Sequence, residues 1–260
     1  MPSLRFCSLG SGSSGNATLV ESSSGPSIAR VLLDCGMPFK HLEERLAVRG
    51  LQTKDLNAVF ITHEHSDHVG CARQLAVQAR IPVWMSRGTY HAIGRPDLKG
   101  QLRFASDQIS ISIGDLCLHP FTVAHDAKEP LQLKVSNGDK TLGLLTDLGH
   151  ATLHTLAQMQ GLDALILECN HVAELLSKSR YPLFLKERIL GHFGHLSNHQ
   201  AANFLAQIAH PRLMHVVAAH LSEQNNTPAL VVAELASVWP DYMSRVVVAN
   251  ATQGFDWLTL

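Results

Sequence analysis

Long apolar runs are missing from this sequence. No stretch approaches the roughly 18 consecutive apolar residues that a membrane-spanning helix requires. The opening segment, MPSLRFCSLG, also lacks the basic region and the long apolar region of a secretory signal. We therefore expect a protein that does not enter a membrane and is not exported by a recognisable signal.

Cysteine is scarce, and its pattern excludes two classes of small stabilised fold. The five cysteines are odd in number, are widely separated and contain no Cys-x-x-Cys pair; they are Cys7, Cys35, Cys71, Cys117 and Cys169. A disulfide framework uses an even set in an exported chain, and thiolate zinc sites use closely spaced pairs. The pattern predicts a reducing, cytoplasmic setting.

Neither sign of charge is in excess. Lys and Arg number 21 against 22 Asp and Glu, which gives a net charge of -1. Proteins that coat nucleic acid or an anionic membrane surface usually carry a clear positive excess. Any contact with nucleic acid must therefore be local. The 45% of hydrophobic residues is enough for a substantial core.

The first part of the chain predicts strands interrupted by helices. β-rich runs bounded by turn residues occupy 4–9, 17–22, 29–36 and 56–62, and the first three resemble a meander. A helix is predicted over 38–50, with Pro38 at its first position and Gly50 as its stop. A second helix is predicted over 69–80.

The rest of the chain predicts hairpins followed by alternating helices and strands. The hairpins turn at Gly114-Asp115 and Asn137-Gly138. Apolar strands are predicted at 164–168, 213–220 and 245–250. We find no linker and no repeat of fixed period. These elements predict an α/β (α+β) fold in which two mixed sheets pack together with helices outside, as a single domain over residues 1–260.

Ionisable side chains gather in THEHSDH at residues 62–68, directly after an apolar strand. In a loop leaving a strand, ligands at alternate positions such as His63 and His65 can aim at one point. Asp67 and His68 then turn toward a neighbouring point. The motif therefore indicates two adjacent cations rather than a polar loop with chance histidines.

This motif resembles that of the metallo-β-lactamase superfamily, whose fold is an αββα sandwich. The resemblance implies three later ligands in order, and the chain offers His125, Asp147 and His220 after predicted strands. Each of these residues taken alone could equally be a cap or a hydrogen-bonded side chain. His215, which lies within a predicted strand, is the alternative to His220.

By this resemblance, the two metal sites divide the ligands. One ion would be held by His63, His65 and His125, and the other by Asp67, His68 and His220, with Asp147 bridging them. Two ions about 3.5–4 Å apart share a hydroxide and lower its pKa. The nitrogen and carboxylate ligands are compatible with zinc, manganese or iron.

A second histidine cluster lies in GHFGHLSNHQ at residues 191–200. The pattern that starts here and ends in His-x-Ser resembles the ribonuclease Z branch of the superfamily, and His195 matches its histidine that protonates the departing oxygen. The alternative is a role in helix capping, with Ser197 or Asn198 as the cap. His192 and His199 are expected at the surface.

Several longer stretches narrow the resemblance to the YycJ family, also called WalJ. These stretches are LGSGSSGN, THEHSDHVG, LTDLG, ECNH, YPLFLKERILGHFGHLSN and AHLSEQNN, and they span nearly the whole chain. The resemblance implies a cytoplasmic, metal-dependent nuclease with 5′-to-3′ exonuclease action on DNA. In this role Asp67 would assist the hydroxide and His195 the leaving group.

The sequence identifies substrate-binding residues less specifically than metal ligands. Ser222 and Asn225 follow the last ligand and could donate to a phosphate, or they could cap the next helix. The loop LGSGSSGN favours a plain turn over a ligand contact. The residues Lys178, Arg180, Lys186 and Arg188 form either a contact for a nucleic-acid backbone or a solvated helix face.

Two other functions remain open at this point. The same ligands serve small-molecule hydrolases that act on cyclic phosphodiesters, thioesters or lactones. A metal-stabilised binding module is the non-enzymatic alternative, and the complete ligand set with a candidate acid disfavours it. The sequence does not define the metal, the oligomeric state or the polarity of cleavage.

Overall fold

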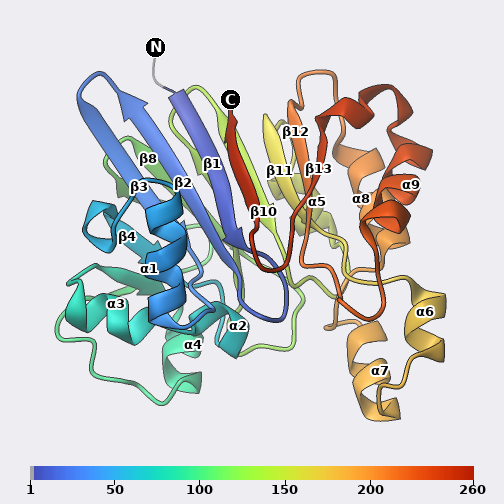
Figure 1. Ribbon diagram of the computed structural model, residues 1–260, viewed down its shortest axis with the longest axis horizontal. Coiled ribbons are helices and arrows are strands. Elements are labelled where there is room, and N and C mark those ends of the chain that lie inside the picture. The colour runs from blue at the N-terminus through green and yellow to red at the C-terminus, as the bar shows by residue number, and fades with distance from the viewer. Residues whose placement is uncertain (1–2) are drawn as a thin grey trace.

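Two seven-stranded sheets lie face to face in the computed structural model, which describes residues 3–260 (Figure 1). The first sheet has the order β14 (Phe255–Thr259), β1 (Ser3–Gly10), β2 (Ala17–Ser24), β3 (Ser27–Leu33), β4 (Ala58–Phe60), β5 (Val83–Met85) and β6 (Leu102–Phe104). The second has the order β13 (Val246–Val248), β12 (His215–Ala219), β11 (Ala164–Glu168), β10 (Thr141–Leu145), β9 (Leu131–Ser136), β8 (Leu116–Thr122) and β7 (Ile111–Ile113).

Helices cover the outer faces of both sheets (Figure 1). Those of the first half are α1 (Phe39–Val48), α2 (Ser66–Val69), α3 (Ala72–Gln78) and α4 (Arg87–Ala92), with the 3₁₀ turn η1 (Thr53–Asp55). In the second half, α5 (Leu153–Gln158), α8 (Asn198–Ile208) and α9 (Pro228–Val238) cover the sheet, with η2 (Pro240–Arg245). The helices α6 (Ala173–Lys178) and α7 (Leu183–Leu190) lie at the lower edge of the molecule. No helix among residues 3–260 is long and apolar enough to span a bilayer.

Alternating side chains of the strands build three apolar layers. In β1, Phe6 points between the sheets and shares an apolar layer with residues of the second sheet such as Leu133. Its neighbour Cys7 points outward and joins a layer that packs under α1 and α3. A third layer lies between the second sheet and α5, α8 and α9. The predicted four-layer αββα sandwich is therefore confirmed.

Most of the predicted elements are present, with small shifts. The helix predicted over 38–50 is α1, and Gly50 ends it with a φ of 73°. Pro38 is the N-cap rather than the first helical residue, because its ψ of 140° is extended. The hairpin at Gly114-Asp115 joins β7 to β8. The second hairpin turn is longer than predicted and spans residues 137–140.

The carboxyl ends of several strands meet at one edge of the sandwich. β3 pairs with β4 in parallel, and β10, β11, β12 and β13 are mutually parallel. Parallel strands end on the same side, so the loops after them gather there. The segments that carry the predicted ligands are among these loops.

Candidate metal centre

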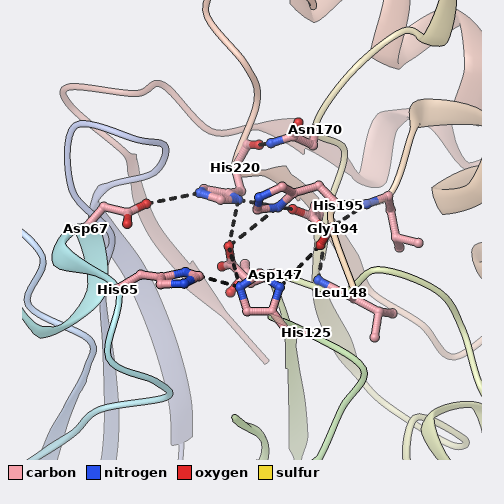
Figure 2. Close-up of polar contacts among 12 residues, drawn as sticks. His65, Asp67, His125, Asp147, Leu148, Asn170, Gly194, His195 and His220 are labelled. Atoms are coloured by element: carbon pink, nitrogen blue, oxygen red, sulfur yellow. Dashed lines mark hydrogen bonds and ion pairs between the residues drawn. The ribbon is translucent and has the colours of Figure 1, made fainter. Parts of the chain in front are cut away.

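Three imidazoles converge after β4 and β8. The Nε2 atom of His63 lies 3.0 Å from the Nδ1 atom of His65. That Nδ1 atom lies 3.3 Å from the Nε2 atom of His125. His65 reaches this position because it is the extended N-cap of α2, which turns its ring back toward the strand end. The three nitrogen atoms form one group of potential metal ligands. Figure 2 shows two of the rings, those of His65 and His125.

A second group lies beside the first. The Asp67 Oδ2 atom is 3.5 Å from His220 Nε2 and 3.7 Å from His68 Nε2. Asp147 stands between the groups: its Oδ2 is 3.0 Å from His68 Nε2 and its Oδ1 is 3.9 Å from His125 Nε2. The structure thus brings together all seven ligands that the sequence indicates. His215, the alternative to His220, begins β12 at the opposite end of that strand.

The donor set fits divalent cations. Asp147 Oδ2 and His220 Nε2 are buried. Each lies near another candidate ligand, at 3.0 Å and 3.5 Å respectively, but neither makes a hydrogen bond of good geometry with a described residue. Buried polar atoms without partners are costly, so such atoms usually indicate a missing ion or water. Imidazole nitrogen and carboxylate oxygen suit zinc, manganese and iron. The residues present are therefore those that a divalent metal site requires.

The backbone at two of the ligands has an unusual conformation. Asp147 and His220 have φ values of 53° and 55°. Residues other than glycine rarely adopt this left-handed region, and those that do are often found at functional sites. Each residue lies just beyond the end of its strand, so the reversed turn directs its side chain toward the other sheet.

Asp34 supports the second group from below. Its Oδ2 lies 2.8 Å from His68 Nδ1, and its Oδ1 accepts a 2.8 Å hydrogen bond from the Thr62 amide. A carboxylate on the outer nitrogen of an imidazole fixes the ring and leaves the other nitrogen for a metal. The sequence analysis missed Asp34, although it follows an apolar strand in LLDCG as the ligands do.

The glycine-rich loop between β1 and β2 is a turn that also braces the site. Asn16 Nδ2 donates to the Asp67 carbonyl at 3.2 Å, and Ser11 Oγ accepts from the His220 amide at 2.9 Å. Gly36, which follows β3, allows the backbone at Asp67 to approach closely. A Cβ atom at position 36 would lie 1.7 Å from the Asp67 carbonyl oxygen. The metal-ligand loop therefore rests directly on backbone of the first sheet.

His195 lies beside the second group and pairs with Glu168. His195 Nδ1 is 2.7 Å from Glu168 Oε1, and the same oxygen is 3.1 Å from His220 Nδ1. Figure 2 shows the rings of His195 and His220 side by side. The other Glu168 oxygen accepts hydrogen bonds from the Leu148 and Leu196 amides. Glu168 is thus a buried orienting group for two histidines, which the sequence analysis did not identify within ECNH.

The charges of this pair stabilise each other. Burial raises the pKa of Glu168, but the charge and hydrogen bond of His195 outweigh it, and the pKa falls to about 2. Burial lowers the pKa of His195, but Glu168 outweighs this effect in turn, and the pKa is raised. His195 is therefore suited to hold a proton next to the ligands.

The other two histidines of the cluster are surface residues. His192 is exposed, and His199 is exposed while its Nδ1 lies 2.9 Å from Glu234. Helix α8 is capped by Ser197, which accepts from the Gln200 amide. The capping role and the position of His195 are therefore separate features of this segment.

A pocket of about 400 Å³ opens over the centre. Asp67, Asp147, His195 and His220 reach it from below. It is further lined by Ser13, His65, Ser66, Asn170, Tyr181, Leu185, Arg188, Ile189 and Ser222. Asn225 is buried beneath Ser222 and donates to its hydroxyl through the backbone amide and Nδ2. Pockets of this size commonly bind small ligands or single residues of polymers.

Comparisons with known proteins agree with this geometry. The sequence profile of the beta-lactamase superfamily domain matches residues 29–216. Exodeoxyribonuclease YycJ of Bacillus anthracis is 32% identical over 90% of this chain and 89% of its own length. Exodeoxyribonuclease WalJ of Streptococcus pneumoniae is 31% identical over 87% of this chain and 84% of its own.

Among solved structures, the metallo-beta-lactamase fold protein YhfI of Bacillus subtilis superposes with a TM-score of 0.74. It is 15% identical in sequence and covers 99% of this chain and 100% of its own. At that identity the likeness is one of fold. It extends over both sheets.

Proposed function

Because the chain belongs to the beta-lactamase superfamily and, within it, to the family of the YycJ and WalJ exodeoxyribonucleases, we propose that it removes nucleotides from DNA in the 5′-to-3′ direction. It is a metal-dependent hydrolase of the nuclease and phosphodiesterase class. The observation that carries the proposal is the pocket itself. Four of the seven potential ligands line it, and so does His195, which is paired with the buried Glu168.

Two divalent ions would be held at this centre. His63, His65 and His125 would hold one, Asp67, His68 and His220 would hold the other, and Asp147 would contact both. Zinc, manganese and iron all suit these donors. When bound, such ions activate water and neutralise the charge of the phosphodiester.

The protein groups perform the proton transfers. The Asp67 carboxylate orients the attacking water. Glu168 accepts a hydrogen bond from the Nδ1–H of His195, and in the charged imidazolium the second proton, on Nε2, is the one that His195 donates to the departing oxygen. Glu168 stabilises the charged imidazole between turnovers. The Ser222 hydroxyl donates a hydrogen bond to a phosphate oxygen of the substrate. Asn225 positions this hydroxyl by donating to it from its backbone amide and its Nδ2.

We further propose that residues 1–260 act as one catalytic domain in the cytoplasm. The ligands come from both sheets, so neither half can form the centre alone. All five cysteines are free, and four of them are buried, which suits a reducing compartment.

Incubation of metal-reconstituted protein with end-labelled nucleic acids tests the proposal. Single- and double-stranded DNA and RNA, labelled at either end, are compared with a thioester. We expect release of labelled mononucleotides from 5′-labelled DNA from the first time points, while 3′-labelled DNA shortens gradually. Hydrolysis of the thioester alone would mean that the protein is a small-molecule hydrolase. Preferential degradation of RNA would change the substrate class.

A further inference from the structure

Helix α7 contributes little to the hydrophobic cores, although most of its residues are apolar. None of its residues is buried, and none belongs to the three apolar layers. Figure 1 shows α7 set apart from both sheets at the lower edge of the molecule. A helix of a globular protein normally buries its apolar stripe in the core. The apolar residues of α7 therefore have another use.

One side of this helix faces the metal pocket. Tyr181, Leu185 and Ile189 are half-buried and line the pocket. Their spacing of four residues places them on one face, with Tyr181 just before the helix begins. Phe184, by contrast, is 69% exposed on another face of the helix. We call the three pocket-lining residues the α7 wall.

Arg188 extends this wall at the edge of the metal centre. Its Nε atom donates to Asp126 Oδ2, and its Nη2 atom lies 3.5 Å from His65 Nε2. The ion pair holds the guanidinium beside the ligands while half of the side chain stays exposed. Guanidinium groups bind phosphate through paired hydrogen bonds, so this position suits a phosphate close to the centre.

The rest of the pocket lining is largely polar. Ser13, Ser66 and Ser222 supply hydroxyl groups, and Asn170 adds an amide. The pocket therefore combines an apolar wall, a cation, hydroxyl groups and potential metal ligands. A nucleotide has matching parts, because its base presents a flat apolar face while its sugar and phosphate are polar.

We propose that the α7 wall packs against the base of the nucleotide being removed, and that Arg188 binds the phosphate of that nucleotide. This inference rests on the proposed nuclease function and adds that the enzyme recognises the base as well as the phosphodiester. Stacking on an apolar wall tolerates every base, because each has a π face. The site therefore accepts all four nucleotides but discriminates against a nucleotide that lacks its base.

The test uses two DNA strands that differ only in the 5′-terminal nucleotide, which is either thymidine or a tetrahydrofuran abasic analogue. We expect the wild type to remove the thymidine nucleotide with a kcat/KM about 10-fold to 100-fold higher, the range that one stacking contact provides. Tyr181→Ala should remove most of this difference by slowing only the thymidine strand. Phe184→Ala, on another face of the same helix, should preserve it.

The phosphate contact has its own matched pair of variants. Arg188→Ala should raise KM for both strands about equally, because both carry the phosphate. Lys40→Ala is the control, since Lys40 is an exposed cation of α1 and is not part of the pocket. Its rates should stay close to those of the wild type. Equal KM values for Arg188→Ala and the wild type would contradict the assignment of Arg188.

Binding without turnover separates recognition from catalysis. In EDTA, Tyr181→Ala should bind the thymidine strand more weakly and the abasic strand unchanged. If Tyr181→Ala melts well below the wild type, Leu185→Ala replaces it in the same comparison. Base recognition is wrong if the wild type degrades both strands equally, or if folded wall variants slow both alike. If the wild type degrades no DNA, the proposed function itself fails and the inference fails with it.

Discussion

At the scale of single residues, the candidate metal centre depends on buried carboxylates that orient its histidines. Glu168 and Asp34 touch histidines rather than the pocket, yet each determines which imidazole nitrogen is available. The seven candidate ligands could be proposed from the sequence because THEHSDH resembles the superfamily motif, and that resemblance implies a His, an Asp and a His later in the chain. Asp34 and Glu168 could not, because their partners lie 34 and 27 residues away and only the pairing of strands brings them together.

The proton held by His195 leads to a prediction that depends on the leaving group. His195→Ala should keep the fold and the metal content but lose about 10²–10⁴ in rate on DNA, the usual cost of removing a general acid. The loss should shrink for a nitrophenyl phosphodiester, whose leaving group needs no proton. Steady-state rates and metal analysis of both proteins measure this. Equal losses on the two substrates would indicate damage to the segment instead.

Asp34 leads to a prediction about metal affinity. Asp34→Asn removes the carboxylate charge from His68 while keeping the size of the side chain, and such a loss typically weakens metal binding about 10-fold to 100-fold. Competition with a chelator should show weaker binding of one ion and unchanged binding of the other, because Asp34 contacts only the second ligand group. Unchanged affinity for both ions would show that Asp34 serves the fold alone.

At the scale of elements, the outer face of the first sheet carries a row of charges across three strands. Arg5 in β1, Glu21 in β2 and Arg30 in β3 are in register. Both Glu21 oxygens accept from a guanidinium Nε at 2.6 Å. Burial raises the pKa of Glu21, but the hydrogen bonds from Arg5 and Arg30 outweigh it, so the pKa lies below its ordinary value of 4.5.

This row predicts a pH-dependent loss of stability. Because the folded pKa of Glu21 is depressed, its contribution is complete above pH 4.5 and disappears as the pH falls through the folded pKa. Glu21→Gln should therefore lower the free energy of unfolding by about 1.5–3 kcal/mol at pH 7, and by less at pH 3. Urea denaturation of metal-free protein measures the difference.

The exposed pair of Lys40 and Glu44 in α1 is the matched control. Their charged atoms lie 3.9 Å apart, and both side chains are more than half exposed. Glu44→Gln should change stability by less than about 0.5 kcal/mol at either pH. If Glu21→Gln changes the free energy of unfolding as little as Glu44→Gln does, the ion pairs of Glu21 with Arg5 and Arg30 do not stabilise the fold.

Elements also differ in how well the sequence predicts them. The core strands β1, β2 and β11 were predicted because each is a clear β-rich run bounded by turns. β14 was missed, because only Phe255 in FDWLT is buried and the segment is a strand through its pairing with β1. Local pattern cannot report a partner that lies about 250 residues away in the chain.

At the scale of the whole molecule, the metal centre joins the two sheets. The histidines of THEHSDH follow β4 in the first sheet, whereas His125, Asp147 and His220 follow strands of the second. Without cations, these ligands leave buried polar atoms unsatisfied between the halves of the molecule. Metal binding should therefore add to the stability of the entire sandwich rather than to that of one loop.

Removal of metal tests this role. The chelated protein should melt at a lower temperature, and each tenfold excess of free metal over the dissociation constant should add about 1.4 kcal/mol per ion. For a chain of this size, that corresponds to a rise of roughly 3–6 °C in melting temperature. Thermal melts at several concentrations of zinc or manganese measure the effect. A melting temperature that is the same with chelator and with added metal would contradict this stabilising role.

The apolar layer between the sheets has a consequence for affinity as well as for folding. One residue of slip between the sheets would move facing groups by about 3.3 Å, whereas ligand distances tolerate only about 0.2 Å. The packing of inner side chains such as Phe6 and Leu133 therefore fixes the relative position of the two sheets, and with it the distances between the candidate ligands. Metal affinity therefore reports how accurately the two sheets are packed together. Loss of a methyl group from this layer, far from the pocket, should weaken metal binding before it unfolds the protein.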